Sequence, residues 1–271
     1  MASLSVDFLK TLQARFRIIL GSTSPRRKQI LNNLGIPYET IPSKFSENLD
    51  WRTFSHPHAY VLENAKQKAI DVYAQVTASN PCQPCLVIGA DTVVYANETV
   101  LEKPKTAAEA LKALQLYRGQ PHAVLTAICL VWASAPADTE PLDTDSSVAL
   151  VLSGADKATE TLSLVNMPGL QEPVWLYSAI EETQVLFAPD VPLEALQAYV
   201  QTGEPMDKAG SYGYQGLASF FISKIDGDYY NVVGFPCHRF FMMLYRLVRL
   251  ECSNLKASLN PMLDSPDELT R

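Results

Sequence analysis

Apolar runs rich in β-branched residues alternate along this chain with stretches whose apolar positions recur at helical spacing. The short runs predict strands over 17–20, 38–41, 86–90, 93–95, 99–101, 122–132 and 183–187. The helical spacing predicts helices over 26–34, 57–76, 106–119, 192–200 and 237–250. A hairpin is expected from strands 218–225 and 229–233 around the turn Asp226-Gly227. This alternation predicts an α/β fold with a mixed central sheet and flanking helices.

The order of these elements divides the chain into an extension, one domain and a tail. Residues 1–16 carry an amphipathic pattern and are expected to form an N-terminal extension, and 253–271 a C-terminal tail. The domain between them, 17–252, is interrupted by a polar segment at 133–182. That segment holds nine acidic residues and one basic residue, whereas the rest of the chain holds 20 acidic and 21 basic residues. We therefore expect an acidic insertion between two strands of the main sheet, with short strands of its own over 148–152 and 173–180.

Composition argues against several kinds of partner. The body of the chain is nearly neutral and has no basic stripe, which argues against binding to long nucleic acid. No apolar run is long enough to span a bilayer, and the start lacks the apolar core of a secretory signal, so no membrane is expected as a partner. Cys82 and Cys85 lack the second pair or histidine that a zinc site needs. Reduced thiols and a cytoplasmic location are the simpler expectation, with an organellar transit role for the first residues left open.

One acidic residue interrupts a long apolar run. Asp91 separates Val87-Ile88-Gly89-Ala90 from Thr92-Val93-Val94. A carboxylate between two buried strands is costly unless it is solvated, paired or bound to metal. Because ligand sites of α/β folds lie at the carboxyl ends of strands, we expect Asp91 to face a cleft. Asp91 and the loop residue Glu47 are candidate ligands of Mg²⁺, and the alternatives are a carboxylate hydrogen-bonded in a turn and a solvated loop acid.

A helix start with two arginines suggests a phosphate site. In the run from Ser22 to Arg27, Ser24 is a good N-cap and Pro25 suits the first helical position. Backbone N–H groups, the serine hydroxyls and a bidentate Arg26 could bind an anion there, and an ordinary capped surface helix is the alternative. Lys68 and Lys103 could neutralise a polyphosphate, although a single lysine on a helix is commonly solvated.

The segment from Asp207 to Gly216 holds three glycines within a few residues. Such a loop permits unusual backbone angles and a close approach to a ligand. Gln215 within it has an amide that can recognise a base edge or a phosphate. A plain linker before the predicted hairpin is the alternative. The histidines show no pairing with Ser and Asp that would indicate a hydrolase triad.

Taken together and in this order, these motifs resemble the Maf-like family of nucleoside triphosphate pyrophosphatases. The resemblance covers about 17–250 except the acidic insertion. It implies a mixed sheet with two lobes around a cleft, as in the related inosine triphosphatase fold. The matching pieces are Ser22 to Arg27, Glu47 in Lys44-Phe45-Ser46-Glu47-Asn48, Lys68 in Lys66-Gln67-Lys68-Ala69, Gly89 to Val94, Glu102-Lys103-Pro104, Gly119 with His122 and Thr126, Asp207 to Gly216, and Asn231 to Pro236.

The resemblance also implies an activity and a cofactor. Family members hydrolyse a nucleoside triphosphate between the α and β phosphates, giving monophosphate and pyrophosphate, with a divalent cation such as Mg²⁺ or Mn²⁺. Carried over by position, Asp91 resembles the proton acceptor that activates water, and Glu47 resembles its metal-binding neighbour. Lys68 and Lys103 complete the implied catalytic set. The implied substrate-binding residues are Ser22, Ser24, Arg26, Arg27, Thr92, Lys208 and Gln215.

Two positions favour one branch of the family. Thr92 and Gln215 resemble the branch that acts on dTTP and UTP, whereas the branch that acts on 7-methyl-GTP tends to replace both. The departures from the family pattern are modest, with Phe235 where Leu is usual and Tyr117-Arg118 in place of Leu-Ser. The alternatives are a 7-methyl-GTP or noncanonical-purine pyrophosphatase, and a nucleotide-binding module without catalysis. The resemblance also favours a homodimer.

Overall fold

In the described part of the chain, nine strands form one mixed sheet. The computed structural model describes residues 2–79, 83–133, 150–151, 160–167, 170 and 173–259. Within them the sheet runs in the order β2-β1-β3-β5-β8-β7-β6, with β4 on β3 and β9 on β8. β1 is parallel to β2 and β3, and the other pairs are antiparallel. The strands are β1 (Arg17–Leu20), β2 (Glu39–Thr40), β3 (Cys85–Ala96), β4 (Thr99–Leu101), β5 (Pro121–Trp132), β6 (Leu150–Val151), β7 (Glu160–Val165), β8 (Val174–Phe187) and β9 (Ile222–Asp226).

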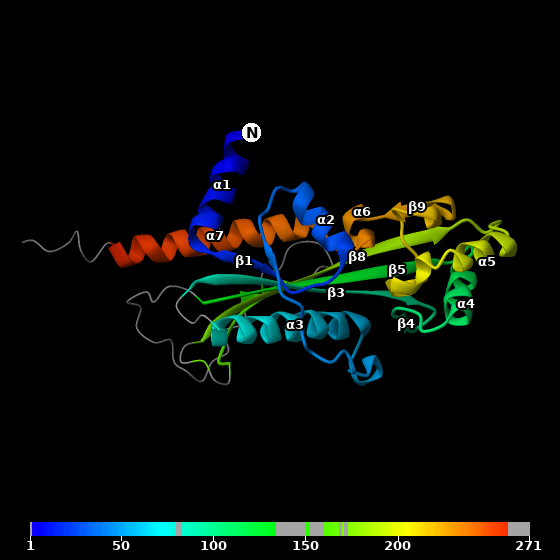
Figure 1. Ribbon diagram of the computed structural model, residues 1–271, viewed down its shortest axis with the longest axis horizontal. Helices are drawn as coiled ribbons and strands as arrows, with labels where there is room; N and C mark the ends of the chain where they lie inside the picture. Colours follow the sequence, from blue (N-terminus) through cyan, green and yellow to red (C-terminus); the bar gives the residue numbers. More distant parts are fainter. Residues whose placement is uncertain are drawn as a thin grey trace, which may run out of the picture.

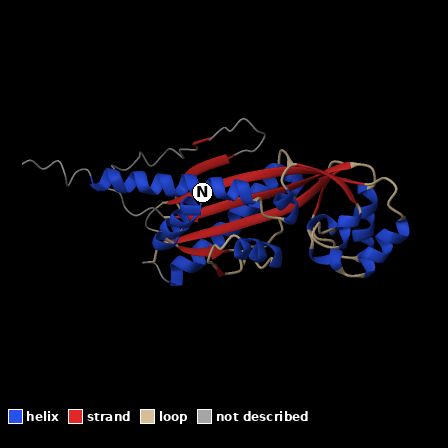
Figure 2. Cartoon of the chain, turned by 90° about the horizontal axis from the view of Figure 1, so that it is seen from above, coloured by secondary structure: helices blue, strands red, loops and turns tan. Residues whose placement is uncertain are grey.

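Helices cover both faces of the sheet. In Figure 1, α3 lies along one face, and α2 and α7 lie on the other. Figure 2 shows the long strands spanning the molecule and a separate group of short helices at one end. The α-helices are α1 (Ala2–Arg15), α2 (Pro25–Asn33), α3 (Pro57–Ser79), α4 (Ala107–Tyr117), α5 (Leu193–Gln201), α6 (Tyr229–Val233) and α7 (Cys237–Leu259). The 3₁₀ turns are η1 (Trp51–Thr53), η2 (Glu204–Asp207), η3 (Ala209–Ser211) and η4 (Leu217–Phe220).

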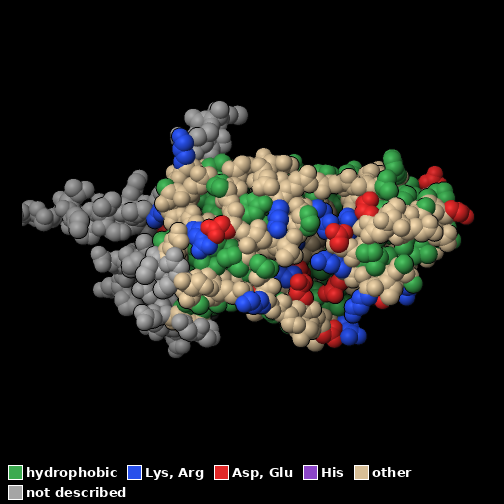
Figure 3. Space-filling model, viewed as in Figure 1, with side chains coloured by type: hydrophobic (Ala, Val, Ile, Leu, Met, Phe, Trp, Pro, Cys, Tyr) green, Lys and Arg blue, Asp and Glu red, His purple; other side chains and the backbone are tan. Residues whose placement is uncertain are grey.

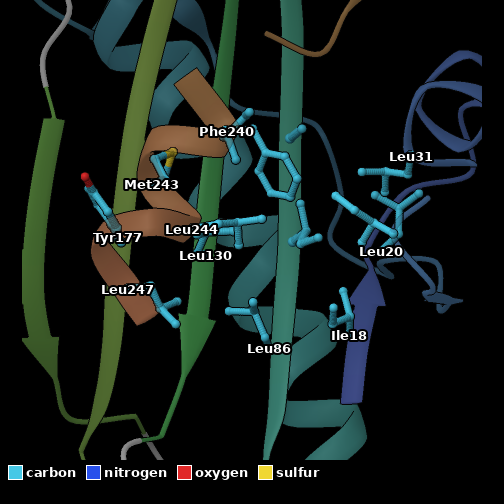
Figure 4. Close-up of a cluster of buried hydrophobic side chains, with 14 of the residues drawn as sticks. Ile18, Leu20, Leu31, Leu86, Leu130, Tyr177, Phe240, Met243, Leu244 and Leu247 are labelled. Atoms are coloured by element: carbon cyan, nitrogen blue, oxygen red, sulfur yellow. The ribbon is translucent and has the colours of Figure 1, made fainter. Parts of the chain in front are cut away.

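β3 presents alternate residues to the two helical layers. Leu86 and Ile88 join the cluster beneath α7, part of which Figure 4 shows together with Leu130 and Leu244. Val87 on the opposite face joins the cluster that packs against α3. Because residues two apart in a strand share a face, the positions that follow Val87 by two and by four also point toward α3. The strand period therefore determines which helix Asp91 meets.

A row of polar side chains divides the face that carries α7. One apolar cluster lies under α7, and a second lies under α4 and α5. Between them Thr92, Thr126 and Thr183 come from three neighbouring strands, and Asn231 of α6 joins them. Thr126 Oγ1 donates to Asn231 O at 3.2 Å and lies 3.1 Å from Thr92 Oγ1, and Asn231 Nδ2 donates to Thr183 Oγ1 at 3.0 Å. We call these four residues the polar seam, and it separates the two apolar halves of the molecule.

Two strands run further than the sequence pattern predicts. β3 is continuous through Asp91, where two separate strands are expected from the sequence. β8 pairs with β5 from Trp175 to Leu186, so 174–182, expected within the acidic insertion, lie in the main sheet. The acidic composition misleads there because Glu181 and Glu182 have partners, Arg239 at 2.9 Å and His58 at 2.8 Å. The strand predicted at 148–152 and the polar stretch around it lie mostly outside the described residues, apart from β6.

The hairpin expected at 218–233 is wrong in its second half. Of the first expected strand, 218–225, the start lies in the 3₁₀ turn η4, and Ile222–Asp226 forms β9, which pairs with β8. The second expected strand, Tyr229–Val233, forms α6. Asp228 caps this helix by accepting from Tyr230 N at 2.8 Å, and Gly234 ends it with φ 110°. A side-chain cap and a left-handed stop outweigh the β propensity of the Tyr-Tyr-Asn-Val-Val run. As a helix, the segment brings Asn231 into the polar seam.

The two ends of the described chain pack together. Leu12 of α1 is fully buried in the cluster beneath α7. Arg15 pairs with Glu251 of α7 at 3.2 Å, and Trp132 Nε1 donates to the same carboxylate at 3.0 Å. α7 continues to Leu259, beyond the end predicted near 250. None of the helices in the described part of the chain combines the length and the hydropathy of a membrane-crossing segment.

Candidate active site

The candidate site lies beside a short open stretch of the edge of β3. β1 pairs with β3 only as far as Leu20 opposite Ile88, and the pairing of β3 with β4 starts only at Val94 opposite Leu101. Between these two pairings, β5 is the neighbour of β3 among the described strands. The sequence pattern predicts that Asp91 follows the end of a strand, but Asp91 lies in the middle of β3. It lies just beyond the carboxyl end of the parallel strand β1, which is where α/β sheets bind ligands.

A cavity of about 620 Å³ opens at this point. In Figure 3, Lys, Arg, Asp and Glu side chains gather around a hollow on the face shown. The structure brings together every residue that the sequence analysis assigns to catalysis, substrate or metal, although these residues come from separate segments of the chain. All of them line the cavity: Ser22, Ser24, Arg26, Arg27, Glu47, Lys68, Asp91, Thr92, Lys103, Lys208 and Gln215.

One ammonium group joins the two candidate metal ligands. Lys68 Nζ lies 2.7 Å from Asp91 Oδ1 and 2.7 Å from Glu47 Oε2. The Lys68 and Asp91 side chains are each 11% exposed, whereas Glu47 is 58% exposed. The carboxylates therefore converge on one point, with Asp91 fixed in the sheet and Glu47 reaching in from a loop at the surface. Lys68 is thus the cation shared by the two carboxylates, and Arg27 adds positive charge close to Asp91.

Gly89 lets α3 approach closely enough for this contact. A Cβ atom at Gly89 would lie 2.6 Å from Ala65 O and 2.7 Å from Ala69 Cβ. Both distances are too short for a side chain to fit without moving α3. Lys68 lies between these two residues on α3, and Asp91 lies two residues beyond Gly89 on the same face of β3. The missing side chain thus sets the distance between the lysine and the aspartate.

The electrostatic setting of Asp91 suits a proton acceptor. Burial raises the pKa of its carboxyl above the ordinary value, and the positive charges of Lys68 and Arg27 oppose that rise. A base whose pKa lies closer to neutrality accepts a proton from water more readily than an ordinary carboxylate does. Lys68 contacts Oδ1, which leaves Oδ2 as the oxygen that could take that proton.

The two neighbouring arginines are used differently. The Arg27 guanidinium donates to Gly234 O at 3.0 Å, to Ala90 O at 2.9 Å, to Ser22 Oγ at 3.2 Å and to Thr92 Oγ1 at 2.9 Å. These bonds join the start of α2 to β3 and to the residue that ends α6. Most of the Arg27 donors are therefore occupied by the protein itself, which points to a structural part in forming the cavity wall.

Arg26 instead reaches across the cavity to the loop that follows α5. It donates to Asp207 Oδ2 at 3.2 Å and to Asp207 O at 3.3 Å. Lys208 Nζ lies 2.7 Å from Asp207 Oδ1 and donates to Glu204 O at 2.6 Å. Two cations therefore share one exposed carboxylate, and an incoming phosphate could compete for both of them. Lys103 is exposed at the cavity wall.

The start of α2 differs in detail from the predicted cap. Pro25 begins the helix as expected, but the Ser24 side chain makes no capping hydrogen bond. Ser24 N instead donates to Ser22 Oγ at 3.2 Å. The local turn is thus closed by Ser22, and the Ser24 hydroxyl lines the cavity without serving as the cap.

The glycine-rich loop packs against Glu204, a residue that is not among the candidates from the sequence. A Cβ atom at Gly216 would lie 2.1 Å from Glu204 Oε1, and one at Gly213 would lie 2.4 Å from Lys208 Cε. Glu204 accepts from Tyr199 OH at 3.1 Å and from Leu217 N at 3.3 Å. The glycines are needed for this close packing, which presents Gln215 at the cavity.

The donor set fits a magnesium-type ion better than a zinc-type ion. Among the residues that the structure describes, no group of three or more acidic, histidine or cysteine side chains converges on one point. Asp91 and Glu47 supply two carboxylates that already share one cationic partner. Mg²⁺ binds through one or two carboxylates, several waters and substrate phosphate oxygens, whereas structural zinc needs four protein ligands.

Comparison with known proteins establishes the family. The family described as "Maf-like protein" matches residues 17–247. The chain is 33% identical over 229 residues to a dTTP/UTP pyrophosphatase of Clostridium perfringens (strain SM101 / Type A), which covers 84% of this chain and 95% of that protein. The chain belongs to the Maf-like family. The resemblance expected from the sequence motifs is therefore confirmed.

Two further relatives of this Maf-like chain come from other organisms. A dTTP/UTP pyrophosphatase of Thermococcus onnurineus (strain NA1) is 34% identical over 219 residues, covering 81% of this chain and 91% of that protein. A human protein named "Probable bifunctional dTTP/UTP pyrophosphatase/methyltransferase protein" is 37% identical over 231 residues. The match covers 85% of this chain but 32% of the human protein, so this Maf-like chain spans about a third of that relative.

Several polar contacts around the cavity of this Maf-like chain gave no signal in the sequence. Tyr60 OH donates to Glu102 Oε1 at the cavity wall, and His122 Nε2 lies 2.8 Å from the hydroxyl of the lining residue Tyr212. Asp71 of α3 binds the loop that carries Glu47. Each of these contacts joins segments that are far apart in the chain, so spacing along the sequence could not reveal it.

Proposed function

We propose that this chain hydrolyses nucleoside triphosphates, with dTTP and UTP preferred, to the nucleoside monophosphate and pyrophosphate. The observation that carries the proposal is the convergence of Asp91, Lys68 and Glu47 at 2.7 Å distances inside a cavity rimmed by further cations. The printed names of the bacterial and archaeal relatives support the choice of substrates.

In the proposed reaction, Asp91 Oδ2 accepts a proton from water, and the water oxygen attacks the α-phosphorus. The bond between the α-phosphorus and the oxygen that bridges to the β-phosphorus breaks, and pyrophosphate leaves with that oxygen. Lys68, held by Asp91 Oδ1, keeps the carboxylate oriented and places positive charge beside the attacked phosphate. Arg26, Lys103 and Lys208 neutralise the charge that develops on the leaving group.

The proposal includes a divalent cation, Mg²⁺ or Mn²⁺, held by Asp91 and Glu47. Such an ion would neutralise phosphate charge and lower the pKa of a bound water. Both carboxylates now contact Lys68 Nζ, so the lysine would have to give up at least part of these contacts to admit the ion. Removal of metal by chelation and dialysis should abolish pyrophosphate release, and addition of Mg²⁺ or Mn²⁺ should restore it.

The structure modifies the sequence argument for substrate preference. Thr92 Oγ1 is bound by Arg27 and lies 3.1 Å from Thr126 Oγ1, so its hydroxyl supports the polar seam. Gln215, which is exposed at the cavity, is therefore the better candidate for contact with a base. We assign Thr92 to shaping the cavity wall.

The test is pyrophosphate release from dTTP, UTP, 7-methyl-GTP and a noncanonical purine triphosphate with Mg²⁺ or Mn²⁺. Asp91→Asn should lower turnover by about 100-fold or more, because general-base catalysis contributes roughly that factor. Asp190→Asn, an exposed aspartate outside the cavity, is the matched control and should leave turnover unchanged. Full turnover in Asp91→Asn would refute the mechanism, and preference for a purine would refute the substrate choice.

Two expectations from the sequence stay predictions. Sedimentation of the purified chain tests the homodimer, and imaging of a tagged chain tests the cytoplasmic location.

Tight nucleotide binding in the absence of turnover would favour a binding module without catalysis.

A further inference from the structure

A single carboxylate oxygen on α3 gathers three hydrogen bonds. Asp71 Oδ2 accepts from Ser43 Oγ at 2.7 Å, from Lys44 N at 2.6 Å and from Gln75 Nε2 at 2.9 Å. The first two donors belong to the loop that follows β2, and the third belongs to α3 itself. Asp71 therefore attaches that loop to the helix through one charged acceptor, and hydrogen bonds to a charged acceptor are stronger than neutral ones.

The attached loop is the one that carries Glu47. Ser43 Oγ, which donates to Asp71, also accepts from Phe45 N at 3.0 Å, and Asn48 N donates to Ser46 O at 2.8 Å. These bonds fold the residues on both sides of Glu47 into a turn that starts at the Asp71 contact. The tether and the turn together define where the Glu47 backbone lies.

Glu47 needs such a tether because its own contact with the site is weak. Its side chain is 58% exposed whereas that of Lys68 is 11% exposed, so holding the glutamate in one geometry costs conformational entropy that offsets part of the attraction. A backbone held by Asp71 lowers that cost. Asp71 lies one helical turn beyond Lys68 on α3, so the helix that carries the lysine also holds the loop that brings the glutamate to it.

We propose that Asp71 is a positioning residue that holds Glu47 in place to bind the divalent cation beside Asp91. The inference rests on the proposed function, since it assigns Glu47 to the metal, and it adds a residue that contacts neither substrate nor metal. Loss of the Asp71 carboxylate releases Ser43 and Lys44, the loop samples more conformations, and Glu47 is placed less often beside Asp91. Metal affinity falls, while Lys68 and Asp91 keep their own contact.

The test compares Mn²⁺ binding to the full chain without nucleotide, measured by electron paramagnetic resonance. Asp71→Ala should weaken binding by about tenfold, the scale seen when groups that orient metal ligands are removed. Asp71→Asn keeps an acceptor of the same shape without the charge, so it should fall between Asp71→Ala and wild type. Gln75→Ala removes the donor that comes from α3 itself and leaves the loop tethered, so it should bind Mn²⁺ as wild type does.

A double-mutant cycle with Glu47→Gln separates positioning from general damage. Because Asp71 is argued to act through Glu47, Asp71→Ala should cause no further loss of Mn²⁺ affinity once Glu47 is neutralised. Amide hydrogen exchange at Lys44 and Phe45 should rise in Asp71→Ala and should stay at the wild-type rate in Gln75→Ala. If Asp71→Ala fails to fold, as judged by thermal unfolding, Asp71→Asn carries the same cycle.

The outcomes distinguish this inference from the proposed function. Equal losses of Mn²⁺ affinity with and without Glu47, or unchanged exchange in the loop, would overturn the positioning role even in an enzyme that releases pyrophosphate. A wild-type chain that binds no Mn²⁺ at millimolar concentration would overturn it as well. Conversely, a coupled cycle in a chain that hydrolyses none of the nucleotides would leave the positioning role intact and refute the function.

Discussion

Arg27 donates to the Thr92 hydroxyl at 2.9 Å, and this bond joins the start of α2 to the polar seam on the sheet. The same guanidinium binds the carbonyl oxygens of Ala90 and Gly234. It therefore fixes three separate segments around the cavity, directly beside Asp91. Arg26, the preceding residue, points to the opposite side of the cavity and forms an ion pair with Asp207. Adjacent arginines in one motif thus have separable roles.

This separation can be tested by two equivalent substitutions. Arg27→Lys removes the planar set of donors and leaves buried acceptors without partners, so we expect a loss of about 3 kcal/mol in the free energy of unfolding. Arg26→Lys should change that free energy by less than about 0.5 kcal/mol and should raise the KM for nucleotide. Urea unfolding and steady-state kinetics measure the two effects. Equal stability of the two variants would contradict the structural role of Arg27.

A methyl group at Gly89 should disturb the site from within the core. In Gly89→Ala the new Cβ collides with Ala65 O and Ala69 Cβ, so α3 must shift. We expect a loss of about 1–3 kcal/mol in stability, typical of overpacking, together with lower turnover because Lys68 moves away from Asp91. Gly35→Ala is the control, because Gly35 has φ +67° with open space around it. It should lose stability only, and wild-type turnover in Gly89→Ala would show that the spacing is not critical.

Lys68 and a divalent cation compete for the same two carboxylates. Lys68→Met removes the ammonium that lies 2.7 Å from both Asp91 and Glu47, so the charge left at the site should attract metal more strongly. We expect Mn²⁺ to bind at least about tenfold tighter, because loss of the repulsion between the ammonium and the ion should be worth about 1.4 kcal/mol or more, while turnover falls because Asp91 loses the group that orients it. Lys66→Met on the same helix, outside the cavity, should change neither quantity. Weaker Mn²⁺ binding in Lys68→Met would mean that the lysine assists the ion.

His122 should make stability depend on pH. Burial lowers the pKa of His122 to about 4, so the folded chain keeps this ring neutral while the unfolded chain protonates it below its ordinary value of 6.5. The unfolded state then binds more protons between these values, so stability is full above pH 6.5 and declines as the pH falls toward 4. At pH 5 the loss is about 2 kcal/mol.

The variant His122→Phe should remove this contribution. Its free energy of unfolding should fall less than that of wild type between pH 7 and pH 5, when both are measured by urea unfolding. His238→Gln replaces an exposed histidine and should keep the wild-type slope. Parallel slopes for all three chains would indicate that His122 titrates normally.

The sequence predicts best the elements whose determinants are local. The helix predicted over 106–119 forms as α4 from Ala107, where Thr106 caps it by accepting from Glu109 N at 3.1 Å. The long apolar run expected to form a strand over 122–132 is likewise borne out by β5. The strand predicted over 229–233 is wrong, because the side-chain cap at Asp228 stabilises a helix in spite of the β-prone residues.

The candidate site likewise has a part that the sequence predicts and a part that it does not. Motif order is enough to place Asp91, Lys68 and Glu47 in one cavity. It does not reveal that Arg27 and Thr92 are bound to each other, or that Glu204 and Asp71 support the loops. Those contacts depend on how strands and helices pack, and two residues that meet through packing leave no mark on the spacing of either segment.

The position of Asp91 inside a paired strand limits how this enzyme can change. A slip of one residue between β3 and β5 would carry the carboxylate to the opposite side of the sheet and bury Ala90 or Thr92 against α3 instead. Insertions and deletions in β3 are therefore barred, because they would separate the base from its lysine. Changes in what the pocket accepts are more easily made in a connection such as 204–216, because a loop can change its length without shifting the register of β3.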